Sequence, residues 1–205
     1  LSVVPKGDWA TPTNDTVVLF KYAATVQPPR ILELGSYRGY TARGLLEHSP
    51  ESRLVAVDIA PDHGEAYLGP ALGERVDRRV GPIGREILGD ERACFDLVFV
   101  DADHAAPAVA HDTEIALEMV APDGALLWHD YANWGYFTGD CGVPEVLNEL
   151  SERLPVGHLV GSNIAVHLPA WVDDRAAFDE LVDETRNRLR GGPWESDSAR
   201  RHGFT

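Results

Sequence analysis

The sequence predicts an α/β fold: a Rossmann-like, doubly wound and mostly parallel seven-stranded sheet that ends in an antiparallel hairpin. Two observations support this prediction. Short apolar runs alternate with segments of helical periodicity along most of the chain, and the last two short strands follow each other without a helix between them. The runs FDLVFVD and ALLWHD are nearly continuous in apolar residues, which is typical of parallel strands covered on both faces.

Each expected strand is a short run rich in Val, Ile, Leu or Phe that ends near a turn residue. In a sheet of this kind, ligands bind at the carboxyl ends of the parallel strands. The hairpin turns at Ser162-Asn163. We expect parallel strands at Ile31–Leu34, Leu54–Asp58, Val76–Val80, Phe95–Asp101 and Gly124–Asp130, and hairpin strands at His158–Gly161 and Ile164–Leu168.

Helices are expected where apolar residues recur at a spacing of three to four. One precedes the first strand, and the others alternate with the strands or follow the hairpin. The expected helices are Thr13–Val26, Thr41–His48, Gly64–Leu72, Ile83–Leu88, Pro107–Val120, Val143–Arg153 and Asp173–Leu189.

The length of 205 residues suits a single domain with a full core. Within this domain, 1–205, we expect a covering segment and helix at 1–28, a core at 29–169, and a helix with a mobile tail at 170–205. Apolar residues make up 44% of the chain and charged residues 25%, an ordinary globular balance. The chain starts at Leu1, so residues before it are not excluded.

The formal net charge of −15 and the pI of about 4.8 disfavour partners with phosphate backbones or anionic surfaces. We therefore expect no nucleic-acid partner. We also expect no membrane partner, because no apolar run could span a bilayer and no signal pattern appears. Cys94 and Cys141 have no zinc or redox spacing, which favours packing thiols in a cytoplasmic protein.

The segment ILELGSYRGYT at residues 31–41 is the most informative motif. An apolar run carries Glu33, a turn with Gly35, Ser36 and Gly39 follows, and a helix begins near Thr41. Glycines let a ligand approach the backbone, and a helix N-terminus offers unpaired N–H groups. The spacing is not the dinucleotide fingerprint, and an acid at this place suits a cationic or hydroxyl-rich ligand. An ordinary strand-turn-helix unit is the alternative.

The motif resembles the first motif of class I S-adenosylmethionine-dependent methyltransferases, and the ELGSYRGYT form is most similar to their small-molecule O-methyltransferase branch. The closing hairpin resembles the same family, whose last strand inserts antiparallel. The resemblance implies that Glu33 lies near the methionine amino group of S-adenosylmethionine and that the glycine turn packs beside its ribose and methionine. The cofactor-binding residues implied are Glu33, Gly35, Ser36, Gly39, Thr41, Asp58 and Asp101.

Asp58 ends the second strand, at the distance from the glycine turn where a ribose-binding acid is expected. A carboxylate there can accept both ribose hydroxyls, although an Asp at such a turn can instead cap a helix. The loop Gly81-Pro82-Ile83 after the third strand would, by the same resemblance, border the adenine.

Acids and histidines cluster after the fourth and fifth strands. Asp101, Asp103 and His104 follow the fourth, and His129 and Asp130 follow the fifth. If these strands are neighbours, the side chains converge, and several like charges in one place need a counter-charge such as a divalent metal. Asp101 and Asp130 are the preferred metal ligands, and His129 could add a nitrogen.

This cluster resembles that of metal-dependent O-methyltransferases, including those that act on natural products and their sugars. The resemblance implies that Asp101 and Asp130 hold the metal and that Asp103 is the candidate base. By its chemistry a histidine, His104 or His129, could take the proton instead. A metal would lower the pKa of the acceptor hydroxyl and align its oxygen. Magnesium prefers oxygen ligands, whereas imidazole suits manganese or another transition metal, so His129 leaves the metal's identity open.

An aromatic, glycine-rich segment, DYANWGYFTGDCGVP, begins at Asp130. Tyr131, Trp134 and Tyr136 could form a substrate wall, because loops beyond strand ends carry specificity in such folds. Packing of these aromatic side chains onto the body of the domain is the alternative.

The sequence therefore favours an S-adenosylmethionine-dependent O-methyltransferase that acts on a small molecule, a natural product or its sugar, with a divalent metal. A metal-independent O- or N-methyltransferase that uses His104 or His129 as its base is the first alternative. A non-catalytic binding protein on the same fold is the second. The glycine spacing and the hairpin disfavour a nicotinamide-dependent oxidoreductase. A homo-oligomer is compatible with the chain.

Overall fold

The computed structural model of the protein describes residues 11–63, 72–132 and 141–168. All of these residues belong to one compact unit that ends at Leu168. The expected helix at Asp173–Leu189 and nearly all of the one at Gly64–Leu72 lie outside the described residues. Those two helices and the division of the chain into three parts therefore remain predictions.

A seven-stranded sheet forms the centre of this unit, in the order β3-β2-β1-β4-β5-β7-β6. The first five strands in that order run parallel, and β7 pairs antiparallel with both β5 and β6. The predicted fold class is thereby confirmed. The strands are β1 Arg30–Leu34, β2 Arg53–Asp58, β3 Val76–Val80, β4 Phe95–Val100, β5 Val120–Trp128, β6 Gly157–His158 and β7 Ala165–His167.

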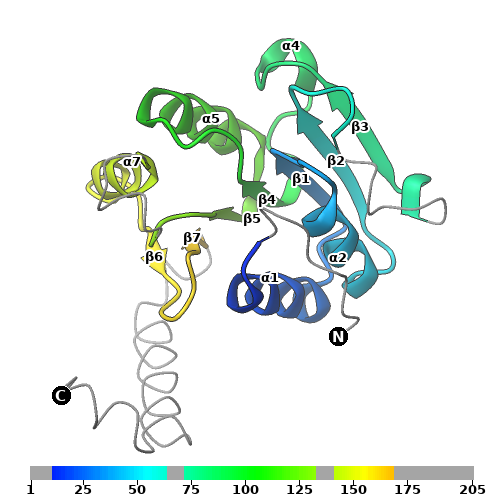
Figure 1. The fold of residues 1–205 in the computed structure, drawn as a ribbon, viewed down its shortest axis with the longest axis horizontal. Coiled ribbons are helices and arrows are strands. Elements are labelled where there is room, and N and C mark those ends of the chain that lie inside the picture. The colour runs from blue at the N-terminus through cyan, green and yellow to red at the C-terminus, as the bar shows by residue number, and fades with distance from the viewer. Residues whose placement is uncertain (1–10, 64–71, 133–140, 169–205) are drawn as a thin grey trace, which may run out of the picture. The chain divides into compact units, whose positions relative to one another are not determined.

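Helices cover both faces of the sheet, with α1 and α2 side by side on one face and α4, α5 and α7 on the other (Figure 1). This arrangement explains why the central strands are apolar on both sides, as in Ile31, Leu32 and Leu34, which are fully buried. The helices are α1 Thr13–Val26, α2 Tyr40–His48, α4 Arg85–Leu88, α5 Ala106–Met119 and α7 Val143–Leu150.

Most predicted elements are confirmed, with ends that move by a few residues. The strand predicted at Gly124–Asp130 begins earlier, at Val120, and ends at Trp128. The helix predicted at Ile83–Leu88 begins only at Arg85, because Gly84 before it keeps an extended backbone. Trp128 is buried in the core, where its indole N–H donates to the Thr113 hydroxyl at 3.0 Å.

The predicted hairpin is present, but its two-residue turn at Ser162-Asn163 is wrong. The connection is longer: the Leu159 N–H donates to the Ile164 carbonyl at 2.9 Å, and Gly161 takes a left-handed backbone with φ of 88°. Glycine adopts this conformation at little cost, so the reversal occurs there. Asn163 is consequently free to make contacts outside the hairpin.

Two further expectations concern the membrane and the cysteines. Within the described residues, no helix combines the length and apolar character required to cross a bilayer. Cys94 and Cys141 are both free thiols, half-buried and buried respectively, and the Cys141 thiol lies 3.6 Å from the Asp130 carbonyl oxygen. Packing is the role that these positions support.

Candidate functional site

The glycine turn after β1 lies directly against the end of β4. Gly35 has φ of 91°, and a Cβ atom placed on it would lie 2.1 Å from the carbonyl oxygen of Asp101. Only glycine fits such an approach. Because β1 and β4 are adjacent, the turn and the residues after β4 share one edge of the sheet. The predicted cofactor cradle and the predicted acidic cluster are therefore neighbours.

Glu33 on β1 is fully buried beneath this turn. Neither of its carboxylate oxygens forms a hydrogen bond of normal geometry with any described residue. The pKa of Glu33 is raised to about 8: burial is the main cause and the charges of Asp101 and Asp58 contribute, while interactions with the Ser36 side chain and the Ala42 backbone offset part of the effect. A buried carboxylate without a partner is costly, and a cationic ligand group would remove that cost.

Asp58 at the end of β2 organises the same turn. Its Oδ2 accepts the N–H groups of Ser36 at 3.0 Å and Tyr37 at 2.9 Å, and its Oδ1 accepts the Ala60 N–H and contacts His63 Nδ1 at 2.8 Å. Partial burial opposes ionisation, but these hydrogen bonds outweigh it and lower the pKa of Asp58. Asp58 thus clamps the turn after β1, and its predicted contact with ribose stays a prediction.

Three potential metal ligands meet where β4 and β5 end. Asp101, His104 and Asp130 each offer one ligand atom, and these atoms all lie within 4.8 Å of one another. The predicted adjacency of the two strands is confirmed by their parallel pairing. His104 Nε2 lies 2.8 Å from Asp130 Oδ2, and this contact is the main cause that raises the pKa of His104. Two carboxylates and one imidazole suit a divalent cation.

Asp130 has an unusual backbone for a residue with a side chain, with φ of 62°. Left-handed backbone is uncommon outside glycine, although Asp tolerates it better than most residues. Such strain often accompanies functional positions, because the surrounding structure must hold the residue there. The side chain of Asp130 is buried, with 8% exposure.

His129 lies buried beside the three ligand candidates. Its Nε2 is 2.9 Å from Asp15 Oδ2, and its Nδ1 is 3.3 Å from both Asp101 Oδ1 and Asp130 Oδ2. Burial alone would lower the pKa of His129, but the surrounding carboxylates prevail and raise it to about 12. The ring is therefore a cation at neutral pH and poorly suited to act as a general base. Its predicted role as a metal ligand stays open, since Nδ1 faces both acids.

Sequence reasoning missed Asp15. This residue lies in the first turn of α1, where an acid is common because it complements the helix dipole. In the structure it is 1% exposed and accepts hydrogen bonds from the backbone N–H of Asn163 at 2.7 Å and from its side-chain amide at 3.0 Å. No local signal separates this buried acid from an exposed one.

Other predicted residues make identifiable contacts. The carboxylate of Asp103 accepts the Ala105 N–H at 2.8 Å in the turn just before α5, and its role as base stays a prediction. The Thr41 hydroxyl lies 3.0 Å from that of Thr11, so α2 is tied to the segment before α1.

The substrate wall is only partly described. The Tyr131 hydroxyl donates to Asn148 Oδ1 at 2.8 Å, and its ring lies 5.1 Å from the His158 ring, as the packing alternative expects. Trp134 and Tyr136 lie outside the described residues. The wall therefore remains a prediction.

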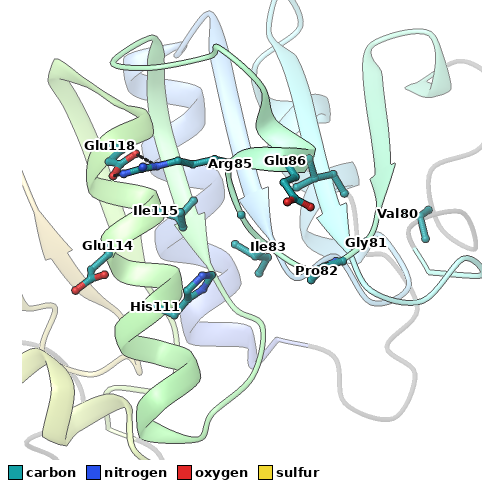
Figure 2. A pocket seen from close by; sticks show the side chains of 12 residues that line it. Val80, Gly81, Pro82, Ile83, Arg85, Glu86, His111, Glu114, Ile115 and Glu118 are labelled. Atoms are coloured by element: carbon teal, nitrogen blue, oxygen red, sulfur yellow. Dashed lines mark hydrogen bonds and ion pairs between the residues drawn. The ribbon is translucent and has the colours of Figure 1, made fainter.

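A pocket of about 660 Å³ lies between the loop after β3 and α5 (Figure 2). The loop predicted to border adenine, Gly81-Pro82-Ile83, forms one end, while an ion pair between Arg85 and Glu118 spans the other part. The three ligand candidates do not line this pocket. We place the chemistry at the cluster, because convergent polar atoms rather than volume define a reactive site. The pocket is lined by Val80, Gly81, Pro82, Ile83, Gly84, Arg85, Glu86, Ile87, His111, Glu114, Ile115 and Glu118.

Comparison with known proteins agrees with this geometry. Residues 32–131 match a family model described as a methyltransferase domain. The malonyl-[acyl-carrier protein] O-methyltransferase of Halorhodospira halophila is 33% identical over 137 residues, which are 61% of this chain and 39% of that protein. The chain covers 39% to 50% of the length of the curated relatives that it matches.

Solved structures share the fold over most of the chain. The O-methyltransferase TomG of Streptomyces achromogenes, involved in tomaymycin synthesis and solved with S-adenosylmethionine, superposes with a TM-score of 0.65 at 25% identity. That match covers 78% of this chain and 82% of TomG. An O-methyltransferase of Bacillus cereus bound to S-adenosylhomocysteine has a TM-score of 0.64 at 19% identity, covering 79% and 84% of the two chains.

Proposed function

We propose that the chain is a class I S-adenosylmethionine-dependent methyltransferase, in line with its match to a methyltransferase-domain model and its shared fold with TomG. It transfers a methyl group to a hydroxyl of a small molecule with the help of a divalent metal. One observation carries this proposal. The contact of Gly35 with the backbone of Asp101 brings a cradle with an unpartnered acid next to a cluster of metal-ligand side chains. Methyl donor and methyl acceptor must meet in such a place.

The cradle fits the cofactor by its chemistry. Glu33 offers a buried carboxylate without a partner, which suits the ammonium group of the methionine moiety. Asp58 fixes the turn that would border the ribose. The bound cofactor would supply a methyl sulfonium, which is already electrophilic. The chain's own task is then to hold that methyl group and the acceptor oxygen in line.

The cluster of Asp101, His104 and Asp130 fits a divalent metal by the chemistry of its side chains. Asp101, His104 and Asp130 are proposed to hold it, with His129 as a further candidate ligand. The metal would lower the pKa of the acceptor hydroxyl and fix its position. The imidazole in this donor set favours manganese or another transition metal over magnesium. Asp103, which is exposed close by in the chain, is the proposed acceptor of the hydroxyl proton, because it can pass that proton to water.

The acceptor is proposed to be a natural product or its sugar. The similarity to TomG, an enzyme of tomaymycin synthesis, supports this class, as does the aromatic segment that contains Tyr131, Trp134 and Tyr136. The net charge of −15 supports a neutral or basic acceptor and argues against nucleic acid.

A metal-free methyltransferase is the second candidate, and one contact favours it. His104 is half-exposed and forms a close pair with buried Asp130, the arrangement of a base and the acid that orients it. His129 is not a suitable base in this version either, because carboxylates face both of its ring nitrogens.

The test begins with chelator-treated protein titrated calorimetrically with S-adenosylhomocysteine. We expect one-to-one binding, followed by methyl transfer to small hydroxyl compounds that depends on added Mn²⁺ or Mg²⁺. Asp101→Asn should abolish the metal-dependent turnover and change the binding of S-adenosylhomocysteine far less than Glu33→Gln does. Asp112→Asn is the matched control, because Asp112 is also a buried acid but lies outside the cluster.

Each outcome separates the candidates. Full activity of Asp101→Asn on the true acceptor would contradict the metal version. Activity that survives chelation but is lost in His104→Gln would favour the metal-free version. Absence of S-adenosylhomocysteine binding by folded protein would contradict both.

A further inference from the structure

We propose that Asp15 is a positioning residue that fixes the ring of His129 and keeps a proton on its Nε2, so that Nδ1 always faces the cluster of Asp101 and Asp130. The inference rests on the proposed function, because it assigns a purpose to that same site. It concerns a residue of the N-terminal helix that no local pattern connects with the chemistry.

Three elements distant in sequence meet at Asp15. The residue lies on α1, His129 follows β5, and Asn163 lies between β6 and β7. The hydrogen bonds span 114 residues to His129 and 148 residues to Asn163. Asp15 and His129 are both buried, with 1% and 7% exposure. Burial of two polar side chains from separate elements is costly unless each is satisfied, so the arrangement is specific.

The hydrogen-bond pattern around Asp15 fixes the direction of each bond. Asp15 Oδ1 accepts the backbone N–H of Asn163, which can only donate, and Oδ2 accepts the side-chain amide N–H of Asn163. Both oxygens of Asp15 therefore act as acceptors toward N–H groups that can only donate. An ionised carboxylate is an acceptor only. Nε2 of His129, 2.9 Å from Oδ2, must therefore be the donor.

Fixing Nε2 as the donor decides what the other ring nitrogen can do. Nδ1 lies 3.3 Å from Asp101 Oδ1 and from Asp130 Oδ2, without a hydrogen bond of normal geometry to a described residue. With a proton, Nδ1 places positive charge between two acids. Without it, Nδ1 presents a lone pair to the same point. Histidine ligands usually bind a metal through one ring nitrogen and donate the N–H of the other to a carboxylate, as His129 donates to Asp15.

The hairpin is held by the same residue. Besides the bonds from Asn163 to Asp15, the side-chain amide of Asn14 donates to the Gly161 carbonyl at 3.2 Å. The α1 helix, the hairpin and His129 are thus joined at one buried carboxylate. Docking of α1 consequently completes the site rather than only covering it.

The test replaces one oxygen of Asp15 with nitrogen, as Asp15→Asn. The Asn oxygen would still accept the Asn163 N–H, so its amide NH₂ would face Nε2 of His129. Nε2 would then have to accept, so the ring would keep its proton on Nδ1 alone, which blocks the lone pair. Replacing a carboxylate that orients a histidine by an amide selects the wrong tautomer in this way.

The measurements are ¹⁵N spectra of the His129 ring at one fixed pH and calorimetric titration with Zn²⁺, a diamagnetic ion that binds imidazole. We expect Nε2 of the wild-type protein to carry a proton both without and with Zn²⁺. In Asp15→Asn, Nε2 should lose its proton and Zn²⁺ affinity should fall by roughly 10- to 100-fold. Binding of S-adenosylhomocysteine should not change. Asp112→Asn, a buried acid on α5, should leave all three readouts at the wild-type level.

An unprotonated Nε2 in the wild-type protein overturns the proposal, even if Asp15→Asn does not fold. Unchanged Zn²⁺ affinity in a folded Asp15→Asn variant overturns it as well. These outcomes differ from failure of the proposed function. Wild-type protein that does not bind S-adenosylhomocysteine would refute the methyltransferase assignment, whereas the ring spectra would still show what Asp15 does.

Discussion

Glu33 makes the proposed cofactor binding depend on pH in a way that can be calculated. Its carboxyl is fully buried, and its pKa is raised to about 8 by burial. The free protein therefore keeps this carboxyl protonated at neutral pH. An ammonium group placed beside it would favour the ionised form, so binding must release a proton.

The magnitude follows from the pKa. At pH 7, a group with a pKa of about 8 is about 90% protonated, so binding should release about 0.9 proton. The affinity should rise with pH because a smaller fraction of the protein molecules must lose the Glu33 proton before binding. Between pH 6 and pH 8 the gain is about 50-fold by this linkage, and above pH 8 the affinity should level off.

The assay is calorimetric titration of S-adenosylhomocysteine at pH 7 in buffers with different enthalpies of ionisation. The slope of the observed enthalpy against the buffer enthalpy gives the number of protons released. Glu33→Gln is the control, since it keeps the shape of the side chain and cannot ionise. It should bind more weakly, and the proton release seen in the wild type should disappear. A wild-type enthalpy that does not depend on the buffer would refute the reasoning.

The raised pKa of Glu33 also predicts that the stability of the cofactor-free protein depends on pH. The unfolded chain loses the Glu33 proton near the ordinary pKa of 4.5, whereas the folded protein keeps it until about pH 8. The unfolded state therefore binds fewer protons in this window, and the free energy of unfolding falls as pH rises from about 4.5 to about 8. The wild type should lose on the order of 5 kcal/mol relative to Glu33→Gln across the window. Urea unfolding at both ends would measure the difference.

Two further substitutions test the cradle. Asp58→Asn replaces the ionised carboxylate that accepts the N–H groups of the glycine turn. Binding of S-adenosylhomocysteine, measured by calorimetry, should weaken by on the order of 1–3 kcal/mol. Unchanged binding would show that Asp58 only holds the turn. Gly35→Ala forces a Cβ to 2.1 Å from the Asp101 carbonyl oxygen in a left-handed backbone, which should lower the free energy of unfolding by about 2–5 kcal/mol in urea. Gly89→Ala has nothing within 4 Å of the added Cβ, and Gly89 also has a backbone that favours glycine, with φ of 64° and ψ of −136°. This variant should show the backbone cost alone, about 1–3 kcal/mol, and equal losses in the two variants would contradict the close approach.

Local patterns were sufficient for much of the fold. The apolar runs at Leu54–Asp58 and Phe95–Asp101 became β2 and β4 with ends within one residue, because a buried parallel strand is recognisable from its own composition. The turn in the hairpin could not be predicted as well. Gly161 and Ser162-Asn163 are all turn formers, and only the long-range contact of Asn163 with Asp15 distinguishes between the possible reversals.

The candidate site also has features that the sequence predicts and features that only the structure shows. Asp101 and Asp130 were predicted as metal ligands from sequence, because each follows a strand and parallel strands place their carboxyl ends at one edge. His104 was predicted as a catalytic residue, and the structure places it among the possible ligands. Asp58 was predicted as an acid at the end of its strand, but its clamp on the glycine turn was not. That clamp depends on the distance between two loops, which no pattern within either loop specifies.

The sequence by itself determined the order of strands and helices, the glycine turn after Glu33 and the acids at the strand ends, because these depend on residues close together in the chain. Tertiary structure decided which strands are neighbours, and therefore that Gly35 lies against Asp101. It also decided that Asp15, 114 residues before His129, forms a hydrogen bond with that ring. The physical reason is that side chains far apart in sequence meet only when the sheet and its covering helices have packed, and burial then sets their charge and hydrogen bonds.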